Sequence, residues 1–450
     1  MKRTTAILKV LLLLGFLAKN GMGAVIYVDA EAIGDNNGTT WSNAYTELQS
    51  ALSVSQTGDD IWVAEGIYKP DQYPANPGGT GNRNEAFQLK NGVAIYGGFD
   101  PTDGDVLIAD RNWKTNPTIL SGDIGTPNNS DDNSYHVFYH PSGLNLDSSA
   151  LLDGFTITNG NANGGSYPHN NGGGVFNRES SPVFQNCTFI NNSAIVSGGM
   201  FNQLSSPELN NCKFYNNSSD FEGGGMKNDH SSPILRDCSF SNNSALNGAG
   251  MFNFSYTTST PVLINCSFAG NQGHGMYNFN SSPSLTNCIF YANHGTALHN
   301  DSSSPIVINC TFSLNIHINT GGIFNINSSP QLKNCILWKN FPIEIQNIGS
   351  SNPQITYSNI DGGYPGEGNI NADPEFATMG LYLTALSPCV DAGASEGAPS
   401  TDMEGELRPF GNGVDMGVDE YYGDCAMGDF DCDGDVDGAD LADFADVYGY

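Results

Sequence analysis

The residues best suited to chemistry are acidic and lie near the C-terminus, in the stretch GDFDCDGDVDGADLADFADVYGY. Its carboxylates at Asp429, Asp431, Asp433, Asp437 and Asp440, with Asp435 and Gly434 between them, take the ligand positions of a 12-residue calcium loop. Alternate carboxylates wrap one hard cation, the glycine permits the sharp turn, and Asp435 offers its backbone carbonyl. We therefore expect these six Asp residues to bind Ca²⁺. A solvated acidic tail is the alternative interpretation.

A short helix is expected directly after this loop. Leu441, Phe444 and Tyr448 recur at helical spacing and would form its apolar face. Cys425 and Cys432 flank the start of the loop, and their close spacing leaves a disulfide and free thiols both open.

Catalytic motifs are weaker. The sequence GHG at 273–275 resembles a motif of the polygalacturonase family, in which the His assists paired aspartates. His274, however, stands where other copies of the repeat described below carry Gly224 or Ala249, which favours a variant of the repeat. The Asn-Thr-Asp and Arg-Ile-Lys motifs of that family are missing, and no carboxylates pair on adjoining repeats, as inverting hydrolysis would require.

Other titratable residues show no site pattern. The basic residues of the repeats occur at no recurring position, which argues against a lyase base; they are Lys213, Lys227, Arg236, Lys333 and Lys339. Four further histidines lack metal-ligand spacing and are expected in loops: His230, His294, His299 and His317. We predict no catalytic residue, no organic cofactor, and Ca²⁺ as the only bound ion.

The middle of the chain consists of seven copies of one unit. Each copy reads like SSPSLTNCIFYANH and contains one cysteine, at Cys187, Cys212, Cys238, Cys266, Cys288, Cys310 and Cys335. A second marker, such as GGGVFN or GHGMYN, precedes the next Ser-Ser-Pro. A period of 20 to 30 residues with two short apolar runs and no helical periodicity predicts a β-solenoid.

The cysteines are predicted to face the interior. Cys187 and Phe189, like their equivalents in the other copies, are two residues apart and so share one face of a strand. The Asn before each Cys is then expected at a turn, where its amide can pair with the coils above and below. Stacked cysteines have parallel Cβ vectors, which is poor disulfide geometry, so we expect reduced, buried thiols.

The Phe-x-x-Asn element of the repeats, as in Phe189 to Asn192 and Phe214 to Asn217, resembles chlamydial-type polymorphic outer membrane proteins. This resemblance implies a right-handed parallel β-helix with adhesin-like use at a surface. Residues 25–123, with an amphipathic segment at Tyr45, Leu48 and Leu52, resemble the N-terminal portion of secreted bacterial proteins of the pectate-lyase-like superfamily. That segment is expected to cover the open end of the solenoid.

The stretches YLTALSPCVDAG, TDMEGELRP and VDMGVDEYY resemble the closing segment of β-helix proteins with exchangeable C-terminal anchors, whose role is structural. The match includes Asp391, Asp402, Arg408, Asp415 and Glu420. In such proteins the anchor follows, and here residues 423–450 resemble half of a dockerin type I module. The resemblance implies a calcium-dependent attachment to a cohesin-like or surface partner.

Charge and the N-terminus limit the location and the partners. Residues 1–24 combine Lys2 and Arg3 with an apolar run and small residues, the pattern of a secretory signal peptide rather than a membrane anchor. The formal net charge of −31, with only 16 Lys and Arg, excludes a phosphate-binding surface and hence nucleic acid. We expect a secreted, extracellular or cell-surface protein with no membrane span after cleavage.

The predicted fold is therefore all-β, a right-handed parallel β-helix followed by an EF-hand-like calcium loop and helix. The expected organisation is a signal peptide (1–24), a cap and first coils (25–123), β-helix repeats (124–345), a closing segment (346–422) and a dockerin-like half module (423–450). The predicted function is a non-catalytic adhesin or scaffold that binds a glycan or a protein. The alternatives are a polysaccharide-active hydrolase or lyase, and a spacer that neither binds nor cuts.

Overall fold

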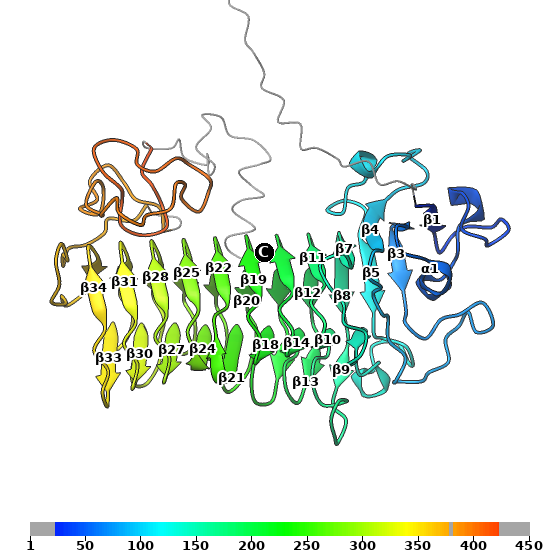
Figure 1. Cartoon of the computed structure of the whole chain (residues 1–450), viewed down its shortest axis with the longest axis horizontal. Helices are drawn as coiled ribbons and strands as arrows, with labels where there is room; N and C mark the ends of the chain where they lie inside the picture. Colours follow the sequence, from blue (N-terminus) through cyan, green and yellow to red (C-terminus); the bar gives the residue numbers. More distant parts are fainter. Residues whose placement is uncertain (1–22, 378–380, 423–450) are drawn as a thin grey trace, which may run out of the picture.

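The computed structural model describes residues 23–377 and 381–422, and the predicted calcium loop and most of the predicted signal peptide lie outside these residues. The described chain winds into a parallel β-solenoid whose coils contribute strands to three long sheets (Figure 1). Equivalent residues pair between coils in register, for example Phe189 with Phe214 and Phe214 with Phe240.

Sheet 1 has twelve strands, in the order β1 (Val25–Val28), β2 (Asp60–Ala64), β4 (Ala94–Phe99), β7 (Leu151–Asp153), β11 (Val183–Gln185), β15 (Glu208–Asn210), β19 (Ile234–Arg236), β22 (Val262–Ile264), β25 (Ser284–Thr286), β28 (Ile306–Ile308), β31 (Gln331–Lys333) and β34 (Gln354–Thr356). Sheet 2 has eleven, in the order β3 (Gly66–Tyr68), β5 (Thr118–Ser121), β8 (Phe155–Thr158), β12 (Thr188–Ile190), β16 (Lys213–Tyr215), β20 (Ser239–Ser241), β23 (Ser267–Ala269), β26 (Ile289–Tyr291), β29 (Thr311–Ser313), β32 (Ile336–Trp338) and β35 (Asn359–Ile360).

Sheet 3 has nine strands, in the order β6 (Phe138–His140), β10 (Val175–Arg178), β14 (Met200–Gln203), β18 (Met226–Asp229), β21 (Met251–Ser259), β24 (Met276–Ser281), β27 (Leu298–Asp301), β30 (Ile323–Ile326) and β33 (Ile345–Ile348). A small fourth sheet joins β9 (Asn161–Ala162), β13 (Ser193–Ala194) and β17 (Ser218–Ser219). The helices are α1 (Leu48–Val54) and the 3₁₀ turns η1 (Trp41–Asn43), η2 (Ile108–Asp110) and η3 (Ser130–Asp132).

Helix α1 lies at the N-terminal end of the solenoid beside β1 (Figure 1). Leu48 and Leu52 are buried in the same core cluster as the interior of the coils. The predicted cap is thus confirmed: the helix covers the interior at the end where the coils begin.

The cysteine prediction is also confirmed. All seven repeat cysteines are free and buried, and each stands next to a buried Phe or Leu ladder. The rings of Phe189, Phe214, Phe240, Phe268, Phe290 and Phe312 stack with centroids 4.4–4.9 Å apart. Burial raises the pKa of Cys335 to about 12, so this thiol stays protonated and unreactive.

Two buried ladders of side-chain amides run the length of the repeats. The Asn of Phe-x-x-Asn forms one: Asn243 Nδ2 donates to Phe214 O (2.8 Å) and to Asn271 Oδ1 (3.1 Å), and its own Oδ1 accepts from Asn217 N (2.9 Å). This ladder ends where the Glu344 carboxylate accepts from Asn340 N (2.8 Å). The second runs through sheet 3, where Asn202 Nδ2 donates to Asn228 Oδ1 (2.9 Å).

We expect Asn243→Ala to lower the free energy of unfolding by roughly 1–3 kcal/mol, because it leaves the N–H of Asn217 buried without a partner. The shift in the midpoint of urea unfolding measures this. Ser241→Ala, on an outward-facing position of β20, is the control and should change stability by less than about 0.5 kcal/mol. Equal shifts for the two variants would contradict a structural role for the ladder.

Candidate functional site

The outward face of sheet 3 carries two parallel rows of side chains. Along each strand, interior residues such as Met251 and Asn253 alternate with outward ones such as Phe252 and Phe254, because side chains in a strand point to opposite faces in turn. The register then aligns the outward residues of successive coils.

The row at the second strand position is here called the aromatic row: Tyr139, Phe176, Phe201, Lys227, Phe252, Tyr277, His299 and Phe324. Neighbouring rings lie 4.1–5.3 Å apart, and the Lys227 ammonium bridges the one gap, 5.8 Å from the ring of Phe201 and 5.5 Å from that of Phe252. Lys227 also pairs with Glu222 at 2.5 Å. Preceding turns cover most of this row, so Phe176 and Phe201 are buried.

The row two positions further on is here called the outer row, and it is half-buried except for its exposed last member, Ile348. Its members are Arg178, Gln203, Asp229, Phe254, Phe279, Asp301, Ile326 and Ile348. Phe254 and Phe279 stack with centroids 5.7 Å apart. Gln203 Nε2 donates to Asp229 Oδ2 (3.1 Å), so polar groups flank the aromatic pair.

An insertion widens this part of sheet 3. The spacing from Cys238 to Cys266 is the longest in the repeats, and β21 is correspondingly long, with a register shift after Phe254. The inserted residues bring out Tyr256, which is 79% exposed and packs edge-on against Phe254 at 4.8 Å. Bulges of this kind often aim a side chain at a functional surface.

An Asp–His pair borders the same patch. His230 Nδ1 lies 2.5 Å from Asp229 Oδ1, and His230 Nε2 accepts from Tyr256 N (3.1 Å). The imidazole is therefore held with the proton on Nδ1 and with both nitrogens engaged. It orients Asp229 and the insertion, and it has no free nitrogen with which to take a proton from a ligand.

The expectation that His299 lies in a loop is wrong. His299 lies in β27, stacked on Tyr277 at 4.1 Å, and it occupies the position that Phe252 and Phe324 hold in other coils. The sequence contained the signal, because GTALHN is one of the repeat markers and its His aligns with the Phe of GGIFN. His230, His294 and His317 do lie outside the strands, as predicted.

Three histidines meet beside the aromatic row. The ring of His274 lies 5.1 Å from that of His299 and 5.3 Å from that of His317. As the repeat alignment predicts, His274 stands level with Ala249. Its Nδ1 accepts from Thr296 N (3.0 Å), which leaves the proton on Nε2 and removes that nitrogen as a metal ligand.

His299 is the member of this cluster whose polar groups are unsatisfied. Only 8% of the residue is exposed, and neither ring nitrogen has a hydrogen-bond partner. Burial, with His274 and His317 nearby, lowers its pKa to about 3, and burial lowers that of His274 to about 4. The cluster is therefore neutral at physiological pH and resists protonation.

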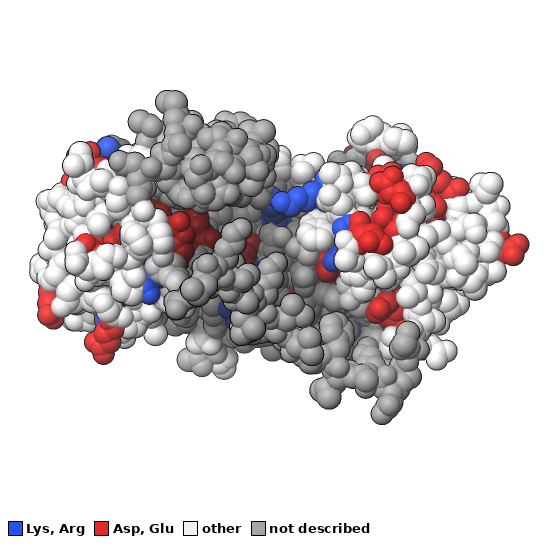
Figure 2. Space-filling view, turned by 90° about the horizontal axis from the view of Figure 1, so that it is seen from above, with Lys and Arg blue, Asp and Glu red and all other residues white. Residues whose placement is uncertain are grey.

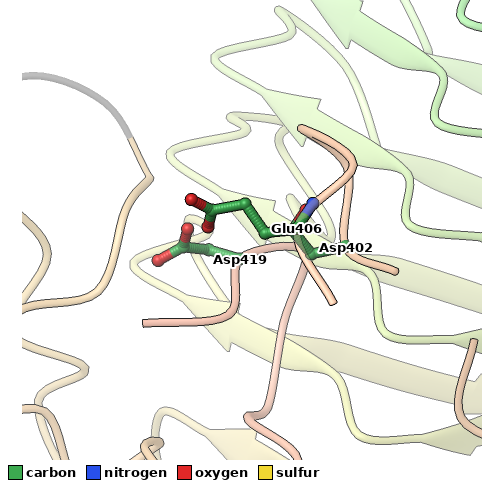
Figure 3. A group of neighbouring side chains, drawn as sticks. All are labelled: Asp402, Glu406 and Asp419. Carbon is green, nitrogen blue, oxygen red and sulfur yellow. The ribbon is translucent and has the colours of Figure 1, made fainter. Parts of the chain in front are cut away.

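A second group of titratable residues lies in the C-terminal segment. Asp402, Glu406 and Asp419 each offer one oxygen within 4.8 Å of the others (Figure 3). These carboxylates suit a hard cation in type and number. Both oxygens of Asp402, however, already accept backbone N–H groups: Oδ1 from Glu404, Gly405 and Glu406, and Oδ2 from Glu420.

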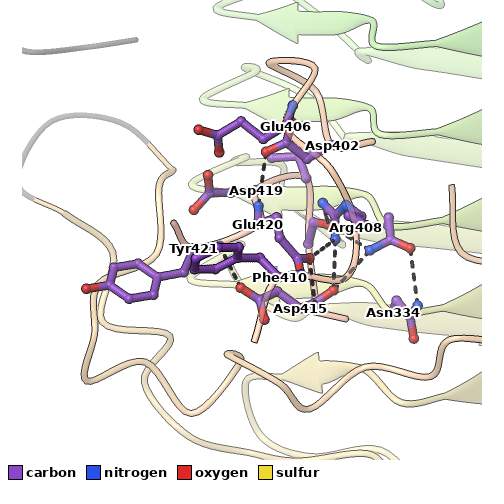
Figure 4. A network of polar contacts seen from close by, with 12 residues as sticks. Asn334, Asp402, Glu406, Arg408, Phe410, Asp415, Asp419, Glu420 and Tyr421 are labelled. Atoms are coloured by element: carbon purple, nitrogen blue, oxygen red, sulfur yellow. Dashed lines mark hydrogen bonds and ion pairs between the residues drawn. The ribbon is translucent and has the colours of Figure 1, made fainter. Parts of the chain in front are cut away.

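The surrounding network ties the turns of the C-terminal segment to one another. The buried Arg408 guanidinium lies 3.2 Å from Glu420 Oε2 and donates to the carbonyls of Asp415 and Gly417 (Figure 4). Asp415 in turn accepts from Asp391 N and Tyr421 N. Burial raises the pKa of Asp415 to about 7, because the ionised carboxylate loses its hydration inside the network.

The structure thus brings together few of the residues that the sequence singled out. The predicted calcium ligands Asp429 to Asp440 and the cysteines Cys425 and Cys432 lie outside the described residues. Lys227 joins the aromatic row, whereas Lys213, Arg236, Lys333 and Lys339 lie apart from it on sheets 1 and 2 or just after them. Sequence reasoning missed the aromatic row, whose signal was the residue before Asn in each marker.

Comparison with known proteins addresses the fold. Residues 253–369 match the family model described as "Right handed beta helix region". The crystal structure of pectate lyase Pel9A is similar, with a TM-score of 0.58 and 14% identity over 89% of this chain and 97% of that chain. The chain has the right-handed parallel β-helix fold, which it shares with this pectate lyase. The predicted solenoid and its handedness are confirmed.

Two further solved structures match the chain more weakly. A rhamnogalacturonan lyase has a TM-score of 0.45 and 13% identity over 80% of this chain and 91% of that chain. PfbA, a surface adhesin of Streptococcus pneumoniae, has a TM-score of 0.31 and 10% identity over 69% of this chain and 87% of that chain. No curated protein sequence matches the chain. At 14% identity, the match to pectate lyase Pel9A shows the fold alone.

Within residues 23–377 and 381–422, no helix is both long enough and apolar enough to cross a bilayer.

We expect His299→Phe to stabilise the β-helix at pH 7 by roughly 1–3 kcal/mol, because it removes two buried unpartnered nitrogens and restores the ring found in neighbouring coils. The gain should grow on acidification. The folded-state pKa of His299 is lowered to about 3, so the unfolded chain takes up a proton below about pH 6.5 that the folded chain does not.

At pH 4 this linkage costs the wild type about 3 kcal/mol, and the variant escapes it. Urea unfolding of both proteins at pH 7 and pH 4 measures the difference in their free energies of unfolding. The contributions of the other buried histidines and carboxylates are common to both proteins and cancel in this difference. His294→Asn, at an exposed position in the same coil, should leave the pH dependence unchanged. A pH-independent difference between His299→Phe and the wild type would contradict this account.

Proposed function

We propose that this β-helix is a secreted protein that binds a polysaccharide without cleaving it, at the centre of the outer row on sheet 3. The observation that carries the proposal is the patch formed by Tyr256, Phe254 and Phe279, flanked by Asp229 and Asp301. Flat rings that pack against the apolar face of a sugar, with carboxylates placed to accept hydroxyl hydrogen bonds, suit a carbohydrate.

The spacing of the patch suits a polymer. Equivalent residues of successive coils lie about 4.8 Å apart, so a linear chain along the solenoid axis meets one outer-row side chain per coil. Asp229, Phe254, Phe279 and Asp301 come from four consecutive coils, which gives the patch a length of roughly 14 Å. That length accommodates a few sugar units.

The same spacing argues against hydrolysis. Paired catalytic carboxylates in glycosidases lie about 5–9.5 Å apart, closer than the roughly 14 Å that separates the Asp229 and Asp301 positions. His230 has both nitrogens engaged and cannot act as a base. The alternative of a polysaccharide-active enzyme keeps only the support of the shared fold, which does not determine function.

Charge narrows the class of ligand. A chain with a formal charge of −31 and two carboxylates at the patch repels polyuronates, so a neutral or amino-sugar polymer is the better ligand. The polyanionic substrate that the name pectate lyase implies for Pel9A is therefore not carried over to this chain.

Attachment is proposed to reside in residues 423–450. The six Asp residues from Asp429 to Asp440 would ligate Ca²⁺, and the dockerin-like half module would hold the protein to a cohesin-like domain or another surface partner. Export by residues 1–24 would place the protein outside the cell or on its surface, where it could meet both the polysaccharide and the attachment partner.

Binding at the patch can be tested with an array of insoluble neutral, amino-sugar and acidic polysaccharides. For whichever glycan retains the wild type, we expect Tyr256→Ala with Phe279→Ala to weaken binding roughly 10- to 30-fold, at about 1 kcal/mol per ring. Phe410→Ala removes another exposed ring, in the C-terminal segment, and should have no effect on binding. Release of shorter products would overturn the non-catalytic proposal, and equal loss in the control would move the site elsewhere.

Calcium binding is a separate test. Isothermal titration of the whole chain with Ca²⁺ should show a binding site in residues 423–450, and the double variant Asp429→Ala, Asp433→Ala should lose it. Asp402→Asn, which alters the acidic group of Figure 3, should leave the site unchanged. Loss of the site in Asp402→Asn instead would transfer calcium binding to the closing segment.

A further inference from the structure

The loop that joins β5 to β6 contains a carboxylate where later coils have a buried amide. The register pairs Leu120 with Ile157 and Ile157 with Phe189. Three residues further on, Asp123 therefore takes the position that Asn192 holds in the ladder of Phe-x-x-Asn amides. The ladder amides donate hydrogen bonds as well as accepting them, as Asn192 Nδ2 does to Ile157 O (2.9 Å). An ionised carboxylate can only accept, so Asp123 needs a different partner.

Four side-chain oxygens of this loop, residues 122–134, are buried and have no hydrogen-bond partner among the described residues. They are Asp123 Oδ1, Asp132 Oδ1, Asn133 Oδ1 and Ser134 Oγ. Asn133 is 6% exposed and Ser134 is fully buried. Buried polar groups are nearly always paired, so such a group of oxygens calls for an ion or an ordered water.

Backbone contacts bring the two ends of the loop together. Ser134 N donates to Gly122 O (2.8 Å), so Asp123 and Asn133 lie at the base of the loop, on its two stems. Asn133 Nδ2 donates to Asn159 O (2.7 Å), and a Cβ added to Gly122 would lie 2.6 Å from that same carbonyl oxygen. The Asn133 amide is therefore packed close to the point where Asp123 begins the loop.

The two carboxylates face one turn within the loop. Asp123 Oδ2 accepts from Asn128 N (3.2 Å), and Asp132 Oδ2 accepts from Thr126 N (2.9 Å). A Cβ added to Gly125 would lie 2.5 Å from the Asp132 carboxylate, so the close approach of this carboxylate requires glycine there. Each carboxylate thus has one oxygen bonded to the turn and the other, Oδ1, buried and unpartnered.

The charge of these carboxylates is not balanced by a basic side chain. The ion pairs of the described residues include neither Asp123 nor Asp132. Arg83 comes near, but it donates to the backbone carbonyls of Asn133 (2.6 Å) and Asn161 (3.0 Å). Figure 2 shows groups of acidic side chains and few basic ones on the face that it presents. With a net charge of −31, the field around the protein attracts cations.

The type of ligand atom identifies the cation. The loop offers only oxygens, since it contains neither Cys nor His, the ligands that zinc prefers. Two carboxylates balance a divalent charge. Ca²⁺ accepts carboxylate, amide and other oxygens in a flexible geometry, whereas Mg²⁺ demands a near-ideal octahedron and keeps several waters. Calcium therefore fits this loop best.

We propose that residues 122–134 bind one Ca²⁺ through Asp123, Asp132 and Asn133, with Ser134 on the same stem as a further oxygen ligand. This site does not depend on the one proposed for residues 423–450. The loop leads into β6, the strand at the N-terminal end of sheet 3. Calcium bound there fixes the start of the sheet whose outer row carries the proposed polysaccharide patch.

Calcium binding by the loop can be measured in the full chain carrying Asp429→Ala and Asp433→Ala, which removes the proposed site of residues 423–450 from the measurement. Isothermal titration with Ca²⁺ should show a site with a Kd on the order of 10⁻⁴ M, as in extracellular calcium modules. Adding Asp123→Asn with Asp132→Asn should raise the Kd roughly 30-fold or more, because both charged ligands are lost. Asp131→Asn, the same change at an exposed neighbour, should leave the Kd unchanged.

Hydrogen exchange locates the ion. Ca²⁺ should slow exchange of the amides of residues 122–134, and this protection should disappear in Asp123→Asn with Asp132→Asn. Circular dichroism in EDTA should be the same for both proteins, which shows that the variant folds. Failure to bind Ca²⁺ up to about 10 mM, or binding that survives the loss of both carboxylates, would overturn the proposal. Neither result bears on residues 423–450, because every protein compared lacks Asp429 and Asp433.

Discussion

Each coil of this protein must satisfy its polar groups by contact with the coil above and the coil below, and that constraint governs the rest of the structure. The strands of one coil belong to different sheets and do not pair with one another, so the strand backbone and the buried amides of one coil bond to the same groups of the next. Buried amides without partners are costly, so the ladders tolerate little slippage of register. Interior positions are consequently uniform, with Cys, Phe, Met and Asn repeated from coil to coil. The outward positions escape this requirement and are free to differ.

The same constraint explains the Ser-Ser-Pro signature, which sequence reasoning used only as an alignment marker. The first Ser of one coil donates its N–H to the first Ser hydroxyl of the following coil, as Ser205 does to Ser231 Oγ at 2.9 Å. The second Ser bonds in the opposite direction, as Ser232 N does to Ser206 Oγ at 3.0 Å. One tripeptide thus ties each coil to both neighbours. The hydroxyls complete the bonding of the turn between sheets 3 and 1, where the strands break and their backbone pairing is interrupted.

The fold could be predicted well from the sequence, because repetition turns local patterns into long-range contacts. Once Cys187 and Cys212 are aligned as equivalent residues, it follows that they lie next to each other on adjacent coils. The burial of the thiols, and the pairing of the Asn amides that precede them, follow from the same alignment. The candidate site could not be predicted in this way. It depends on outward residues that differ between coils. His299 is an example: it is atypical for its marker, and the prediction followed its residue type rather than its position in the repeat. The stack of His299 on Tyr277 follows from register, whereas the exposure of Tyr256 follows from an insertion that no repeat template contains.

Variation along the outer row also argues that binding is local rather than spread over the solenoid. Passing along sheet 3, the row changes from polar Arg178, Gln203 and Asp229 to aromatic Phe254 and Phe279, then to Asp301 and finally to aliphatic Ile326 and Ile348. Both outward rows are aromatic together only on β21 and β24, which is also where the inserted residues protrude. A polymer lying along the axis would therefore meet ring faces over two coils, with hydrogen-bonding groups on both sides: Gln203 and Asp229 before the rings and Asp301 after them. A repetitive scaffold with uniform spacing thus confines the proposed site to one place along its axis, because only two adjacent coils carry rings in both rows.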